Sequence, residues 1–166
     1  MGIDTTREPR AVLDEAIRSK ALAAEFFDFL SNSVPGVKLR QTFQRFSRDE
    51  REQRKILMKY RRDLYGSGDL AKLRAEPGAL SRLTGEISAG TDLLHAIAVA
   101  FRTEERNTRF YVEAALNFSD RHAKIFFRIL AESGRARQEQ LNGLRVAIER
   151  DGLLHGTVEP LQLQPV

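Results

Sequence analysis

Hydrophobic side chains recur every three or four positions along four long segments of the chain, which is the spacing of amphipathic helices. The segments cover about residues 8–33, 37–65, 91–118 and 119–151, and all four are rich in Ala, Leu, Glu and Arg. In the first two segments the apolar face comprises Leu13, Ala16, Ile17, Ala24, Phe27, Leu30, Leu39, Phe43, Phe46 and Leu57. The pattern predicts an all-α protein built from four long helices.

The connections between these predicted helices differ in length. A short turn at Pro35-Gly36 joins the first two and "NFSD" joins the last two, whereas about 25 residues separate the second helix from the third. Thr91 and Ser119 are expected to cap the starts of the third and fourth helices, and Gly152 to end the fourth. Two antiparallel hairpins joined by one long crossover have the connectivity of a ferritin-like four-helix bundle.

A constant shift of 84 residues aligns the first pair of predicted helices with the second pair, over residues 13–57 and 97–141 without a gap. The matched pairs include Leu13 with Ile97, Ala16 with Ala100, Ile17 with Phe101, Phe27 with Tyr111, Phe43 with Phe127, Phe46 with Leu130 and Leu57 with Leu141. Unrelated amphipathic helices would share the period but not the register of both helices and the turn. We infer an internal duplication, with the two hairpins packed around a pseudo-twofold axis.

Length and composition fit one globular domain of 166 residues, and we assign residues 1–152 to the bundle and 153–166 to a C-terminal tail. The chain has no long apolar run and no signal-peptide pattern, so we expect a cytoplasmic protein without a membrane span. Cysteine is absent, which excludes disulfides and thiolate metal sites. The formal charge of +4 comes from arginines scattered among acids, so binding of nucleic acid or anionic lipid ranks only third among the functions considered.

Polar residues on the predicted inner faces carry a further pattern. The third helix contains "AFRTEERNTRFYVEAA", in which Glu104 precedes Tyr111, and the second contains "FQRFSRDEREQ", in which Glu50 stands three residues before Gln53. Together with the crossover, these segments resemble the rubrerythrin branch of the ferritin-like superfamily from about residue 11 to residue 150. The resemblance implies two iron ions held by a Glu from each of two helices and a Glu-x-x-His pair from each of the others.

The chain departs from that pattern at most of the implied ligand positions. These six positions hold Lys20, Glu50, Gln53, Glu104, Gly134 and Arg137, so two carboxylates and neither histidine remain. A carboxylate buried without a partner is costly, whereas Arg137 and Lys20 can donate several hydrogen bonds to one. We therefore expect an internal salt-bridge cluster in place of metal, with the Tyr111 hydroxyl bonded into its polar centre. In this interpretation the protein has no cofactor and no catalytic residue.

Other interpretations of the two acids stay open. Ser47 and Glu50 have the spacing of a capping box, which would start a helix near residue 48 and make Glu50 a cap. Glu104 could be an exposed charge like Glu105, although the duplication favours an inward Glu104. A residual site for iron or another divalent metal, formed by Glu50 and Glu104 with or without Gln53, is a further alternative.

The leading hypothesis is a non-enzymatic scaffold or interaction protein that forms a homodimer. The alternative is the family activity in residual form, a metal-binding oxidoreductase acting in peroxide or iron handling. Lys20 and Arg137 separate the two, because a cation at a ligand position repels a metal ion at close range.

Overall fold

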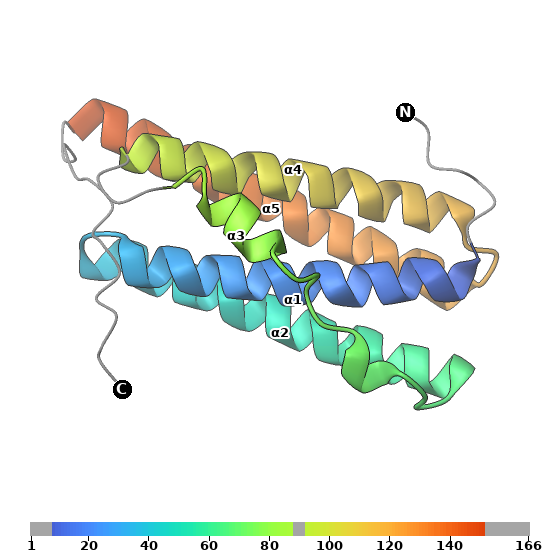
Figure 1. The fold of residues 1–166 in the computed structure, drawn as a ribbon. Helices are drawn as coiled ribbons and strands as arrows, with labels where there is room; N and C mark the ends of the chain where they lie inside the picture. Colours follow the sequence, from blue (N-terminus) through green and yellow to red (C-terminus); the bar gives the residue numbers. More distant parts are fainter. Residues whose placement is uncertain (1–7, 88–91, 152–166) are drawn as a thin grey trace, which may run out of the picture.

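Four long helices lie side by side in this computed structural model, which describes residues 8–87 and 92–151 (Figure 1). They are α1 (Pro9–Ser33), α2 (Val37–Tyr65), α4 (Leu93–Asn117) and α5 (Arg121–Asp151). The described residues contain no strand, and the prediction of an all-α four-helix bundle is confirmed. None of the described helices is long and apolar enough to cross a lipid bilayer.

The helix starts differ in detail from the predicted caps. Asp92 caps α4, where its side chain accepts a hydrogen bond from the Leu94 amide; the predicted cap, Thr91, lies outside the described residues, as does Gly152. The prediction of Ser119 as the cap of α5 is wrong. Asp120 takes that place, because its carboxylate accepts hydrogen bonds from the amides of His122 and Ala123.

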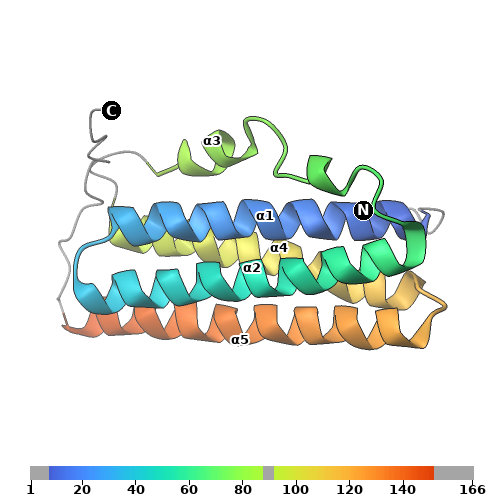
Figure 2. The same ribbon diagram turned by 90° about the horizontal axis from the view of Figure 1, so that it is seen from below.

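The crossover runs back along α1, so that α4 starts at the same end of the bundle as α2 (Figures 1 and 2). It contains two elements that the sequence analysis did not assign, the 3₁₀ turn η1 (Leu70–Lys72) and the short helix α3 (Ala79–Thr84). Its buried apolar side chains are Leu73, Ala79, Leu83 and Ile87. Burial of these side chains fixes the crossover on the bundle and keeps α3 against α1.

The helix bounds repeat with the same shift of 84 residues that aligned the two halves of the sequence. α1 begins at residue 9 and α4 at residue 93, and both have 25 residues. α2 begins at residue 37 and α5 at residue 121. In the first hairpin the turn uses Gly36 in the positive-φ region, at 81°, which a residue with a side chain rarely adopts.

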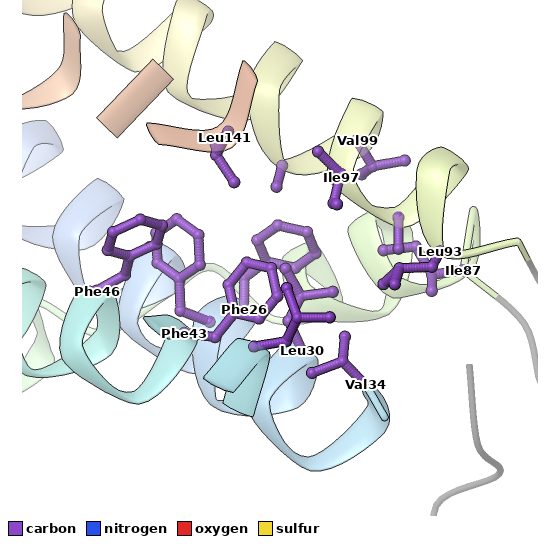
Figure 3. Close-up of a cluster of buried hydrophobic side chains, with 14 of the residues drawn as sticks. Phe26, Leu30, Val34, Phe43, Phe46, Ile87, Leu93, Ile97, Val99 and Leu141 are labelled. Atoms are coloured by element: carbon purple, nitrogen blue, oxygen red, sulfur yellow. The ribbon is translucent and has the colours of Figure 1, made fainter. Parts of the chain in front are cut away.

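Two apolar clusters fill the bundle, one toward each end. The first contains Phe26, Leu30, Phe43, Phe46, Leu93, Ile97 and Leu141 (Figure 3). The second contains Leu13, Ile17, Leu57, Tyr111, Phe127 and Leu130. On every long helix the buried members of the two clusters are 9 to 11 residues apart, or about two and a half to three turns, and those turns meet in the middle of the bundle.

Candidate functional site

The middle of the bundle holds four charged side chains, one from each long helix. They are Lys20 on α1, Glu50 on α2, Glu104 on α4 and Arg137 on α5, and their exposed fractions are 3, 1, 2 and 4%. Each comes from the helical turn between the two apolar clusters, which continue the same inner face on both sides. Helical periodicity therefore forces these groups inward, where only one another can satisfy them.

Glu50 is the centre of this charged cluster. Its Oε1 atom accepts a hydrogen bond from Lys20 Nζ at 3.0 Å and another from Arg137 Nη1 at 2.5 Å. The same Arg137 nitrogen donates to Glu104 Oε1 at 3.1 Å. Two carboxylates are thus bridged by one guanidinium, and a second cation bonds to the same Glu50 oxygen.

Each of the two cations lies against at least one aromatic ring. Lys20 Nζ lies 4.7 Å from the centre of the Tyr111 ring, and Arg137 Cζ lies 5.5 and 5.2 Å from the rings of Phe27 and Phe46. The negative faces of these rings add a favourable interaction with each cation in a region closed to water. The cluster is therefore held by charge, by hydrogen bonds and by ring faces together.

The electrostatic balance keeps both bases charged. Burial is the largest single effect on Lys20 and lowers its pKa, but the attractions of Glu50, Tyr111 and Glu104 together outweigh it, and the pKa lies above the ordinary 10.5. Burial also opposes the charge of Arg137, yet Glu104 and Glu50 raise its pKa further. Burial raises the pKa of Glu104 despite the attraction of Arg137, so the protein interior opposes the charge of this carboxylate.

Because Gly134 has no side chain, the Thr108 side chain can occupy the space beside it. A Cβ atom placed on Gly134 would overlap the Thr108 hydroxyl and would lie 3.6 Å from Glu104 Oε2. The shift of 84 residues relates Thr108 to Ala24 and Gly134 to Glu50. The first hairpin thus pairs the small Ala24 with the large Glu50. At the equivalent positions the second hairpin pairs the larger Thr108 with Gly134.

Gln53 and Tyr111 lie beside the charged cluster but do not bond into it. Gln53 donates from Nε2 to Ser133 Oγ at 2.9 Å, and its buried Oε1 atom has no partner among the described residues. Burial raises the pKa of Tyr111, whose hydroxyl lies near Ser19 without a hydrogen bond of good geometry in the described part of the chain. The expectation that this hydroxyl bonds into the polar centre is wrong, because Lys20 meets the ring face instead.

Glu50 is not a helix cap and Glu104 is not an exposed charge. Ser47 lies inside α2 and donates to the Ala24 carbonyl at 3.0 Å, so Ser47 and Glu50 form no capping box. Glu104 is buried and Glu105 is exposed. Thr108 and Ser133 were not predicted to lie at the site. The alignment of Thr108 with the smaller Ala24, and of Gly134 with the larger Glu50, could have indicated the contact between Thr108 and Gly134.

Comparisons with known proteins agree with this architecture. Residues 11–143 match the family model described as Rubrerythrin. The chain belongs to the rubrerythrin family. A hypothetical protein from Pyrococcus furiosus has a similar structure, with a TM-score of 0.71, 16% identity, and coverage of 89% of this chain and 94% of that one. A metal-free dinuclear-site form of Rhodobacter capsulatus bacterioferritin has a TM-score of 0.69, 17% identity, and coverage of 99 and 100%. No curated protein matches the chain.

The rubrerythrin family implies a metal centre, and the side chains in the middle of this bundle do not fit one. Where a cation would be held between carboxylates, the Lys20 and Arg137 nitrogens already contact Glu50 Oε1. Gly134 offers no ligand atom, and Thr108 fills the space above it. Within the described residues, no group of three or more His, Cys, Asp or Glu side chains is placed to hold a metal ion.

Proposed function

We propose that this member of the rubrerythrin family is a non-enzymatic scaffold or interaction protein whose bundle is held together by the charged cluster instead of metal. The observation that carries the proposal is the shared acceptor: one Glu50 oxygen receives hydrogen bonds from both Lys20 and Arg137. Two carboxylates and two cations then balance without an external ion. Such a centre contributes to the bundle's structure and offers no open coordination position for oxygen or peroxide.

The alternative is a metal-binding oxidoreductase of the rubrerythrin type, acting in peroxide or iron handling. It would need Glu50 and Glu104 to exchange their present partners for iron or another divalent metal. That exchange would leave the Lys20 and Arg137 charges buried without counter-ions, which is strongly unfavourable. The position of these two cations therefore favours the scaffold.

An assay of ferrous-iron oxidation and hydrogen-peroxide consumption tests this proposal. The wild type is compared with Glu104→Gln, which removes one of the two carboxylates that a residual metal site needs while keeping the size of the side chain. We expect both proteins, incubated with ferrous iron, to react at the rate of the buffer. A wild-type rate above that of the variant would establish the oxidoreductase.

We also propose that the scaffold is a homodimer, joined through the outer faces of α2 and α5. These helices lie side by side, as the Gln53–Ser133 bond indicates, and expose Ile56 and Ile129 to 51% each. Covering these side chains with a second copy would remove apolar area from water. Light scattering should give twice the chain mass for the wild type and the single mass for Ile56→Glu/Ile129→Glu; a monomeric wild type would contradict the dimer.

A further inference from the structure

A cleft of about 640 Å³ lies outside the charged cluster, where the crossover passes over the bundle. Its walls come from α1, from the crossover around α3, and from α4. Figures 1 and 2 show α3 lying along the outside of the bundle at this place. The volume falls within the range of about 300–1,000 Å³ that is typical of small-molecule sites.

Three arginines and two glutamates line this cleft: Arg18 and Glu15 on α1, Glu76 in the crossover, Arg82 on α3 and Arg106 on α4. Arg18 Nε lies 3.6 Å from Glu76 Oε1. Ion pairs as exposed as this one contribute little to stability. Neither Arg82 nor Arg106 donates a side-chain hydrogen bond or forms an ion pair within the described ranges. Two guanidiniums in the cleft wall thus have donor groups without a partner in the part of the chain that the structure describes.

The walls formed by α1 and α4 combine one polar pair with an apolar surface. Ser19 donates to Asn107 Oδ1 at 3.3 Å, which leaves the amide nitrogen of Asn107 as a donor without a partner in the described part of the chain. Phe110 and Leu22 supply apolar surface beside this pair. The cleft therefore combines hydrogen-bond donors, an excess of one positive charge from three arginines against two glutamates, and apolar surface.

We propose that this cleft binds a small organic anion with an apolar body, such as an aromatic carboxylate or sulfonate. The guanidiniums of Arg82 and Arg106 would hold the anionic group by charge-assisted hydrogen bonds, which arginine forms in pairs with planar or multi-oxygen anions. Phe110 and Leu22 would cover the apolar body. This site is separate from the charged cluster and does not depend on whether the bundle centre holds metal.

Titration with 8-anilinonaphthalene-1-sulfonate, followed by fluorescence and by equilibrium dialysis, tests the proposal on the full chain. The test variant is Arg82→Glu/Arg106→Glu. The matched control, Arg40→Glu/Arg48→Glu, makes the same charge change at two exposed arginines of α2 that lie outside the cleft. Circular dichroism checks that each variant is folded, and Arg82→Gln/Arg106→Gln replaces the test variant if it is not.

We expect one binding site per chain, weakened at least about tenfold in the test variant and less than about twofold in the control. The uncharged analogue N-phenyl-1-naphthylamine should bind more weakly than the sulfonate and should not distinguish the variants. Equal binding by wild type and test variant, an equal loss in both double variants, or equal affinity for the charged and uncharged probes would overturn the proposal.

Discussion

Lys20 and Arg137 come from helices at opposite ends of the sequence and donate hydrogen bonds to the same oxygen of Glu50. Sharing one acceptor makes Glu50 the member of the charged cluster on which both cations depend. Glu104 depends on fewer partners, because within the described ranges it accepts a hydrogen bond from Arg137 alone. Glu50 and Glu104 would have equivalent roles in a symmetric metal site, but here they differ in the number of cations that they bind.

This inequality predicts different costs for removing the two charges. Glu50→Gln leaves two buried cations with one carboxylate between them, and we expect it to lower the free energy of unfolding by about 3–5 kcal/mol. Glu104→Gln should cost less, about 1–3 kcal/mol, because burial opposes the charge of this carboxylate and, among the described residues, only Arg137 bonds to it. Urea denaturation of both variants measures the difference.

The exposed neighbour Glu105 provides the control for that comparison. Glu105→Gln should change the free energy of unfolding by no more than about 0.5 kcal/mol. A loss from Glu104→Gln that equals or exceeds the loss from Glu50→Gln would show that Glu50 is not the centre of the cluster.

The contact between Thr108 and Gly134 predicts opposite effects for two glycine substitutions in one helix. Gly143→Ala, which meets nothing within 4 Å, should stabilise the protein by up to about 1 kcal/mol through helix propensity. Gly134→Ala should instead destabilise it by about 1–3 kcal/mol, because its Cβ overlaps the Thr108 hydroxyl. Thermal and urea unfolding of the two variants, with Thr108→Ala/Gly134→Ala as partial rescue, checks this. Equal stabilisation by both glycine substitutions would mean that position 134 has free space.

The raised pKa of Lys20 predicts a loss of stability at alkaline pH. Its stabilising contribution is fully present below 10.5, the ordinary pKa of the unfolded chain, and disappears as the pH rises through the higher pKa of the folded state. We expect the difference in unfolding free energy between wild type and Lys20→Met to be constant from about pH 7 to pH 9 and to shrink above pH 10.5.

Lys38→Met is the control for the alkaline series, because Lys38 is exposed on the first turn of α2. Its difference from the wild type should stay small at every pH. If the difference in unfolding free energy between wild type and Lys20→Met also stayed constant up to pH 11.5 (about one unit past the ordinary lysine pKa), the Lys20 charge would not contribute to folding.

Periodicity was sufficient to predict the four helices and their pairing. Residues such as Leu13 and Phe43 repeat at helical spacing, and only one long link was available for the crossover. The inward positions of Glu50 and Glu104 could also be predicted, because the shift of 84 residues places Glu104 opposite Lys20 in the alignment and between apolar positions. Local periodicity and the duplication are both properties of the sequence itself.

The contacts between helices could not be predicted in the same way. Gln53 turns to Ser133, Lys20 meets the face of Tyr111, and Arg61 is fully buried against Asp14, all through the packing of different helices. Sequence spacing fixes which face a residue occupies, but rotamer and partner depend on the neighbouring helix. The short helix α3 was missed because its six residues are too few to show a period.

Metal content tests most directly the claim that Lys20 and Arg137 take the place of metal. The protein is purified after growth with added iron, manganese and zinc, and its metals are measured by mass spectrometry beside those of Lys20→Ala/Arg137→Ala. We predict far less than one metal ion per chain in the wild type. Stoichiometric iron or manganese in the wild type would contradict the account.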